Sequence, residues 1–197
     1  MILVLHKPYG ILSQFTPELN SQWKTLQEFV LPKHVYPVGR LDADSEGMLV
    51  LTDERKIVDQ LLSPAHGHAR TYWVQVEHDV TNESLDRLSS GVVIQGRRTL
   101  PCQARIIDPK PCIYERVPPI RTRKAITTSW IELVLTEGRN RQVRKMTAAV
   151  GNPTLRLIRV QVGALCLFDL TISAGQWCEL DTAQRRLLLQ SSDRSKD

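Results

Sequence analysis

Short strand-like runs, separated by turn residues, set the fold class of this chain. Thr71 to Glu77 reads T-Y-W-V-Q-V-E and Ser129 to Thr136 reads S-W-I-E-L-V-L-T, which is the β-branched and aromatic content typical of strands. Similar runs occupy residues 2–6, 11–15, 35–38, 48–51, 155–162 and 176–180. The first two flank the turn K-P-Y-G and predict a hairpin. Strands outnumber helices and occur in neighbouring pairs, so we expect an α+β fold with a mixed, largely antiparallel central sheet and flanking helices.

Capping residues mark the expected helices. A T-x-x-E capping box at Thr25 predicts a short helix to about Leu31. Asp53 is expected to cap a helix that ends near Ser63, and Thr182 to cap the last helix of the chain. Two further helices are expected over residues 81–90 and 140–150, the second ending at a glycine.

Length and composition indicate a globular protein. The chain has 197 residues, of which 42% are hydrophobic and 24% charged. We expect one domain over residues 1–190, built as two lobes around one sheet, and a disordered tail over residues 191–197. The apolar runs are too short to span a membrane, and the start lacks the sections of a signal peptide. A monomer in the cytoplasm, without membrane association, is therefore the expectation.

The cysteines and histidines do not form a metal-binding pattern. Cys102, Cys112, Cys166 and Cys178 include no C-x-x-C pair, and no histidine stands at zinc-ligand spacing from them. His66 and His68 are close in sequence but lack further ligands. We expect reduced thiols, no metal and no cofactor.

Positive charge is concentrated in one part of the chain. Residues 116–159 hold ten basic and two acidic side chains, a net charge of +8, which leaves −3 for the rest of a chain with a total of +5. Residues 109–124 combine four prolines with five basic residues and predict a long exposed loop. Such segregation suits a polyanion such as RNA, although an ordinary solvated basic face stays open as an alternative.

The most unusual stretch is G-R-L-D-A-D-S-E-G-M-L-V-L-T, residues 39–52. Its carboxylates Asp42, Asp44 and Glu46 stand at alternate positions, as in an EF-hand calcium loop. That interpretation fails because the twelfth position is Asp53 rather than glutamate, and because a proline and a glycine stand where the entering helix should be. A solvated turn remains an alternative for Asp44 and Glu46, but it does not explain the whole pattern.

The same stretch resembles the catalytic motif of the pseudouridine synthases of the RsuA branch, in which a single nucleophilic aspartate follows Arg-Leu. Asp42 is the matching position. The resemblance runs from residues 7–8 to 155–159, and residues 118–124 and 127–130 are most similar to members that act on the large ribosomal subunit. It implies the pseudouridine synthase fold, isomerisation of a uridine in 23S ribosomal RNA without cofactor or metal, and no small N-terminal RNA-binding (S4-like) domain.

Two further segments carry the resemblance. R-T-Y-W-V, residues 70–74, resembles the family's K-x-Y-x-V motif, whose tyrosine stacks on the target base, so the resemblance assigns that role to Tyr72. Arg70 stands in place of the usual lysine, and its planar guanidinium is not equivalent to an ammonium. Residues 137–146 are similar to the motif E-G-x-x-x-Q-[IV]-R. There Arg144 matches the arginine that pairs with the catalytic aspartate, which here is Asp42.

Helical geometry divides the 140–150 segment into two faces. At about 100° per residue, Arg141, Arg144 and Lys145 share one side, whereas an apolar set packs on the other. That apolar set is Val143, Met146, Thr147 and Val150. The basic side is expected to contact RNA or Asp42, and both Asp42 and Arg144 are expected to be largely dry. Arg40 and the 116–124 loop would hold phosphates, with Arg139 and Asn140 at the helix N-terminus.

The implied chemistry needs one carboxylate. Making pseudouridine breaks the N1–C1′ bond, turns the uracil and joins C5 to C1′, and a stacked uridine must first be flipped out. Attack at C1′, attack at the base and a glycal route all stay open. A non-catalytic RNA-binding protein with the same fold is the rival hypothesis, and only the enzyme needs Asp42.

Overall fold

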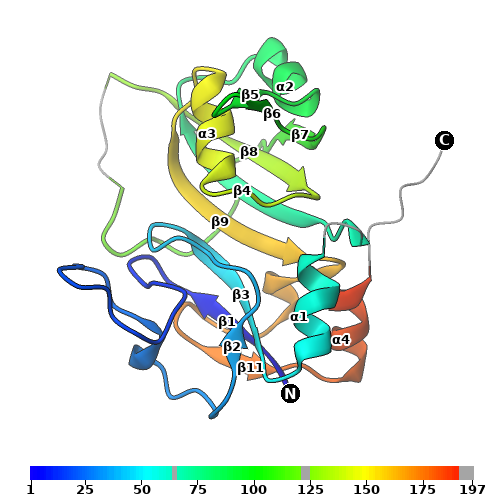
Figure 1. Cartoon of the computed structure of the whole chain (residues 1–197). Helices are drawn as coiled ribbons and strands as arrows, with labels where there is room; N and C mark the ends of the chain where they lie inside the picture. The colour runs from blue at the N-terminus through cyan, green and yellow to red at the C-terminus, as the bar shows by residue number, and fades with distance from the viewer. Residues whose placement is uncertain (64–65, 121–124, 191–197) are drawn as a thin grey trace. The chain divides into compact units, whose positions relative to one another are not determined.

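The computed structural model describes residues 1–63, 66–120 and 125–190 and confirms the α+β class (Figure 1). The strands are β1 (Ile2–Lys7), β2 (Tyr36–Pro37), β3 (Glu46–Thr52), β4 (Arg70–Glu77), β5 (Val93–Ile94), β6 (Arg97–Arg98), β7 (Gln103–Ile106), β8 (Thr128–Leu135), β9 (Thr154–Val162), β10 (Leu165–Cys166) and β11 (Trp177–Glu179). The α-helices are α1 (Arg55–Leu62), α2 (Asn82–Ser89), α3 (Gln142–Ala149) and α4 (Thr182–Leu189), and two 3-10 helices are η1 (Leu26–Glu28) and η3 (Leu167–Asp169). The predicted tail over 191–197 and part of the basic loop, 121–124, lie outside the described residues.

The chain divides into two compact units. Unit 1 comprises residues 1–70 together with the chain from 159 onward, and unit 2 comprises residues 71–158. The chain leaves unit 1 at the start of β4 and returns to it within β9. Unit 1 is therefore assembled from two separate stretches of sequence, whereas unit 2 is one continuous stretch.

Strand β1 is the centre of unit 1. The strands there run in the order β11-β1-β3-β9, and β1 is antiparallel to both of its neighbours, with Lys7 opposite Gly47. The predicted hairpin between residues 2–6 and 11–15 is wrong, because both edges of β1 are already paired. Ile11 instead makes an isolated parallel bridge to Lys24.

Side chains on β1 alternate between two buried environments. Ile2 and Val4 join an apolar cluster with Met48 and Val50 of β3, and this cluster also takes residues from α1, β9, β10, η3 and α4. The intervening positions of β1 are also buried but belong to the other face, as the period of two in a strand requires. Lys7 continues this second series at the end of the strand, so its side chain enters a buried environment.

The helices of unit 1 begin differently from the prediction. Helix α1 has Glu54 at its N-cap without a side-chain cap, because Asp53 binds the amino group of Met1 instead, at 2.7 Å. Helix α4 is capped by Asp181 in a capping box with Gln184, rather than by Thr182, since Asp181 stands one residue earlier and accepts from the Gln184 amide. Residues 26–28 form only one 3-10 turn, with the Thr25 hydroxyl accepting from Gln27 at 3.3 Å.

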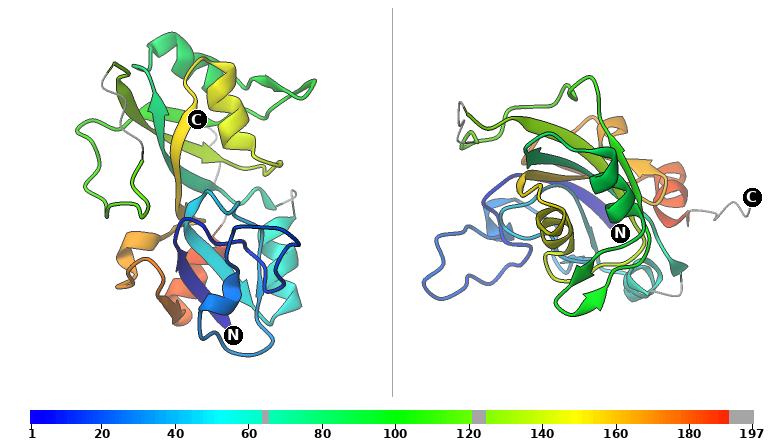
Figure 2. Two further views of the ribbon diagram at one scale, coloured as in Figure 1. Left: turned by 90° about the vertical axis from the view of Figure 1, so that its left-hand side faces the viewer. Right: turned by 90° about the horizontal axis from the view of Figure 1, so that it is seen from above.

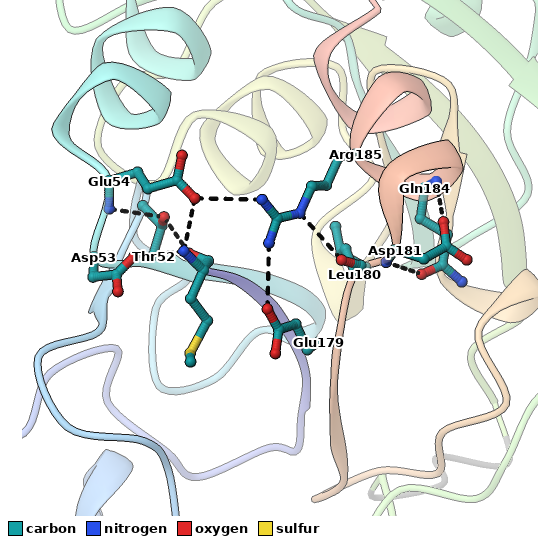
Figure 3. Close-up of polar contacts among 9 residues, drawn as sticks. Thr52, Asp53, Glu54, Glu179, Leu180, Asp181, Gln184 and Arg185 are labelled. Atoms are coloured by element: carbon teal, nitrogen blue, oxygen red, sulfur yellow. Dashed lines mark hydrogen bonds and ion pairs between the residues drawn. The ribbon is translucent and has the colours of Figure 1, made fainter.

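A network of charges joins the two stretches of sequence that form unit 1 (Figure 3). The Met1 amino group lies 2.7 Å from both Asp53 and Glu54, and the Arg185 guanidinium lies 3.4 Å from Glu54 and 3.3 Å from Glu179. The hydrogen bonds that the Met1 amino group donates to Asp53 and Glu54 raise its pKa. The hydrogen bond from that amino group lowers the pKa of Asp53. Arg185 thus ties α4 to the start of α1 and to β11.

Unit 2 carries the remaining strands in the order β9-β4-β8-β7, with β7 and β8 antiparallel. Strand β5 and strand β6 form a separate hairpin. Helix α2 contacts β7 and helix α3 contacts β5 (Figures 1 and 2). The core joins Val74 and Val76 of β4 to Ile131 and Leu133 of β8 and to the apolar side of α3. Among the described residues, no helix has both the length and the hydropathy needed to cross a membrane.

Candidate functional site

The loop that carries Asp42 is held on both sides of that residue. The Ser13 hydroxyl donates to the Leu41 carbonyl at 2.7 Å and accepts from the Leu41 amide at 3.1 Å. The Gly10 amide donates to the Ala43 carbonyl at 2.8 Å, and the Ser45 amide closes a turn onto the Asp42 carbonyl at 3.0 Å. Segment 10–13 therefore clamps the residues before and after Asp42. We expect this to fix the backbone position of Asp42.

Lys7 lies fully buried at the end of β1, in the same unit. Its Nζ atom donates to the Ile11 carbonyl at 2.7 Å and to the Pro8 carbonyl at 3.1 Å. Burial lowers the pKa of Lys7 to about 7; the carboxylates of the acidic loop oppose this change, and the Arg159 guanidinium adds to it. Those carboxylates, in decreasing order of effect, are Glu46, Asp44 and Asp42. The acidic loop thus lies beside a buried lysine that the sequence analysis did not assign to the site.

Glu46 and Arg159 are also buried beside this loop. Glu46 is the first residue of β3 and is 1% exposed, so the solvated-turn alternative is wrong for it. The Arg159 Nε atom donates to the Met48 carbonyl at 2.8 Å. Gly47, with φ of +102°, lies so close to Arg159 that a Cβ atom on it would be 2.3 Å from the Arg159 carbonyl oxygen. Only glycine suits both this dihedral and this contact.

Asp42 and Arg40 differ in exposure. Asp42 is half-buried and Arg40 is exposed. Asp42 is therefore partly shielded from water, on a loop that lies between β2 and β3. An exposed Arg40 is compatible with the expected contact to phosphate.

The tyrosine of the second motif lies in unit 2. Tyr72 is half-buried on β4 and packs against the apolar cluster of that unit. Its neighbour in the motif, Arg70, donates from a guanidinium nitrogen to the Leu61 carbonyl at 2.9 Å. This bond lies at the C-terminal end of α1, where carbonyl groups lack helical partners. In this chain the arginine that replaces the family's lysine is therefore used to anchor α1.

Helix α3 confirms the expected apolar face and corrects the expected start. The four residues of the expected apolar side are buried, and Arg144 is partly buried, with its Nε atom inaccessible to solvent. The helix begins at Gln142, because Arg141 has φ of +52°, a left-handed conformation that a helix does not contain. Arg139 and Asn140 therefore precede the helix. Gln142 is buried and binds backward to the Arg139 amide at 2.9 Å and to Glu137 at 2.7 Å.

Two basic residues of α3 and its entry segment are tied to the β5–β6 hairpin. The Arg139 guanidinium pairs with Glu137 at 3.1 Å and donates to the Arg98 carbonyl at 2.8 Å. The Lys145 ammonium donates to the Gln95 side chain at 3.0 Å and to the Asn140 carbonyl at 2.7 Å. Both side chains therefore form hydrogen bonds within the protein, and both remain partly exposed to solvent.

The hairpin adds basic residues that the sequence analysis missed. Arg97 and Arg98 are exposed and follow a turn in which Gln95 and Gly96 have φ of +50° and +75°. The signal for this hairpin is Gly96 as the second of two residues between Val-Ile and Arg-Arg, because glycine adopts the positive φ that a two-residue hairpin turn needs. Arg141, which precedes α3, is exposed as well.

The described part of the basic loop is bound to unit 2. The Arg156 guanidinium lies 4.8 Å from the centre of the Tyr114 ring and donates to the Tyr114 carbonyl at 3.0 Å. The four cysteines are free. Within the described residues, no group of three histidine, cysteine or carboxylate side chains could hold a metal ion.

The predicted site residues therefore divide between the units. Asp42 and Arg40 belong to unit 1, together with the buried Lys7 and Arg159. The others belong to unit 2: Tyr72, Arg139, Arg141, Arg144 and Lys145. The Asp42–Arg144 pair joins residues of different units and stays a prediction. In unit 1 the arrangement provides a carboxylate on a clamped loop near the buried Lys7 and Arg159, which suits a nucleophile or base that must keep a fixed position.

Comparison with known proteins agrees with these motifs. Residues 1–149 match the family described as RNA pseudouridylate synthase. Ribosomal large subunit pseudouridine synthase E of Xanthomonas axonopodis pv. citri (strain 306) is 52% identical over 163 residues, which cover 83% of this chain and 86% of that protein. The protein of the same name from Vibrio vulnificus (strain CMCP6) is 46% identical over 179 residues, 91% of this chain and 74% of the relative. A crystal structure of a pseudouridylate synthase has the same fold, with a TM-score of 0.77 and 24% identity over 95% of this chain and 73% of the other.

Proposed function

We propose that this chain, which belongs to the RNA pseudouridylate synthase family, isomerises a specific uridine of 23S ribosomal RNA to pseudouridine with Asp42 as its catalytic nucleophile. The chain is an RNA pseudouridine synthase and hence an isomerase. The large-subunit substrate is inferred from the names of relatives that are 44% to 52% identical. The observation that carries the role of Asp42 is its position after Arg-Leu on a loop that is clamped at both neighbouring residues.

The reaction needs a carboxylate in a fixed position. The N1–C1′ bond breaks, the uracil turns, a C5–C1′ bond forms, the proton on C5 is released, and N1 takes up a proton, so that atoms and charge balance. No electrons are gained or lost overall. Attack at C1′, attack at the ring and a glycal route each use one carboxylate. The hydrogen bonds to Leu41 and Ala43 support this role, because they restrain the Asp42 backbone without using the Asp42 side chain.

We propose the remaining roles from the same motifs. Tyr72 stacks on the flipped uracil, and Arg144 pairs with Asp42. Phosphates are bound by Arg40 and by the basic residues around α3, namely Arg139, Arg141 and Lys145. The exposed Arg97 and Arg98 extend this basic surface of unit 2. We expect the protein to act as a monomer in the cytoplasm, where ribosomal RNA is available.

Tritium release from C5 tests the assignment of Asp42. The substrate is 23S ribosomal RNA labelled at uracil C5, because joining C5 to C1′ must release that label. Wild-type protein should release tritium, and Asp42→Asn should bind the RNA but release none. Asp44→Asn is the matched control, because Asp44 is a half-buried carboxylate two residues away in the same loop, and it should keep most of the turnover. Release by Asp42→Asn at the wild-type rate would refute the proposed role.

The same assay separates the enzyme from a non-catalytic RNA-binding protein. Both would bind RNA in a salt-sensitive way, but only the enzyme releases label. Arg144→Met should retain RNA binding and lose most of its turnover. A near-normal rate for this variant would reject the proposed pairing of Arg144 with Asp42.

A further inference from the structure

Two aromatic pairs accompany the segment that clamps the Asp42 loop. Tyr9 and Trp23 have ring centres 5.6 Å apart and planes at 83°, and Phe15 and Tyr36 have ring centres 6.4 Å apart and planes at 85°. Both are edge-to-face pairs. In sequence, Tyr9 and Phe15 stand immediately outside the clamp, one residue before Gly10 and two residues after Ser13. The two pairs are thus connected through one rigid segment to the backbone on either side of Asp42.

Tyr36 is exposed although it is well fixed. Its side chain is 63% exposed, and among the described aromatic residues only Phe168, at 43%, is also exposed. The Tyr36 backbone is paired to Thr52 in the β2–β3 ladder, and its ring contacts Phe15. An aromatic ring in water that is already oriented loses little conformational entropy when a second flat group stacks on it. Most of the Tyr36 ring is therefore available to a ligand.

The segment that carries Tyr36 bears exposed positive charge. Between Glu28 and Asp42 it contains Lys33 and Arg40 and no aspartate or glutamate. Both of these cationic side chains are exposed. A protein partner would be expected to meet a continuous apolar patch, whereas here one exposed aromatic ring, that of Tyr36, is accompanied by cations. Aromatic side chains beside cations are the combination that binds unpaired nucleic acid strands, where bases stack and phosphates meet positive charge.

We propose that the Phe15–Tyr36 pair is a stacking platform for an unpaired base of the substrate RNA near the modified uridine, with Tyr36 as the residue in contact. The platform rests on the proposed function, because it presupposes that Asp42 acts on a uridine of RNA. It is distinct from Tyr72, which belongs to unit 2. Because every base has a π-face, the platform adds affinity for single-stranded RNA without selecting a sequence.

Steady-state tritium release from in vitro transcribed 23S ribosomal RNA, measured at several salt concentrations, tests the platform. Tyr36→Ala and Tyr36→Leu should each raise KM about 5- to 100-fold with kcat nearly unchanged, since removing an aromatic platform costs that much per stacked base. Leucine keeps the apolar contact with Phe15 but offers no flat face. Tyr36→Phe should behave as wild type, and Phe168→Ala is the matched control with an exposed aromatic removed elsewhere in unit 1.

The salt dependence distinguishes stacking from phosphate binding. The slope of log KM against log salt should be the same for Tyr36→Leu and wild type, because stacking releases no counterions. A wild-type KM for Tyr36→Leu would overturn the platform, and so would an altered slope. A defect seen only with assembled ribosomal subunits and not with the bare transcript would also overturn it, by pointing to a protein partner. Failure of the proposed function is a separate result, since the wild-type protein would then release no tritium at all.

Discussion

Replacing the buried Lys7 should change how the stability of the protein depends on pH. Burial lowers the pKa of Lys7 from 10.5 to about 7, so the unfolded chain carries a proton on this residue at pH values where the folded protein has lost it. The free energy of unfolding therefore rises with pH between these two values. A difference of about 3.5 in pKa corresponds to about 5 kcal/mol at 1.36 kcal/mol per pH unit, of which about 3 to 4 kcal/mol develops between pH 7 and pH 10.

The measurement is a pair of urea titrations of wild type and Lys7→Met at pH 7, 8, 9 and 10, followed by circular dichroism. Methionine keeps the unbranched chain but cannot titrate. Subtracting the two free energies removes the contributions of cysteine and tyrosine, which titrate in both proteins. Wild type should gain stability relative to Lys7→Met as the pH rises. Lys24→Met, at an exposed lysine, should show no such trend. Parallel curves for wild type and Lys7→Met would refute the argued desolvation of Lys7.

Three further substitutions test the packing and polar contacts of unit 1. Gly47→Ala should lower the free energy of unfolding by more than about 3 kcal/mol, because a Cβ atom would lie 2.3 Å from the Arg159 carbonyl oxygen. Gly151→Ala, where φ is positive but the space is open, should lower it by only about 1 to 2 kcal/mol in the same thermal unfolding experiment. Equal costs would contradict the close-contact argument. Ser13→Ala should lower the free energy of unfolding by about 1 to 3 kcal/mol, because the buried Leu41 amide and carbonyl lose their partner. In tritium release it should lower kcat more than it changes KM. An unchanged kcat would argue against the clamp. Arg185→Met should lower the free energy of unfolding by less than about 1 kcal/mol, because its ion pairs are partly exposed. This difference should shrink in high salt. A large loss of stability that does not depend on salt would contradict the partly exposed ion pairs.

Local patterns in the sequence are enough to predict many of the elements. The alternation in residues 71–77 and 129–136 marks β4 and β8 because strand period and β-branched content agree there. The apolar side of α3 follows from helical spacing alone. The α+β class follows from the number and grouping of such segments.

Features that depend on distant residues could not be read from local patterns. Residues 11–15 have strand-like composition, but the edge they would pair with is occupied by β3 and β11, which are 40 or more positions away in the chain. Asp53 has the residue type and position typical of a helix N-cap, but its carboxylate binds the Met1 amino group instead. In both cases a tertiary contact overrides the local preference.

The candidate site also combines residues that sequence motifs reveal with residues that only the folded structure reveals. Motif resemblance is enough to propose Asp42, Tyr72 and Arg144 as site residues. It does not reveal Ser13, whose hydroxyl joins the backbone of Leu41 from 28 positions away. Nor does composition reveal that Lys7 is buried, because lysine is ordinarily a surface residue. Supporting residues of this kind become visible only when the chain is folded.

The divided sequence of unit 1 has a consequence for the order in which the protein is made. Residues 159 onward supply β11, the second neighbour of β1, together with the end of β9 that lies beside β3. Unit 2 is continuous and can complete its own core as soon as residues 71–158 have left the ribosome. During synthesis the sheet of unit 1 therefore stays incomplete until residues 159 onward have left the ribosome, so the loop bearing Asp42 gains its full support only after unit 2 can have formed.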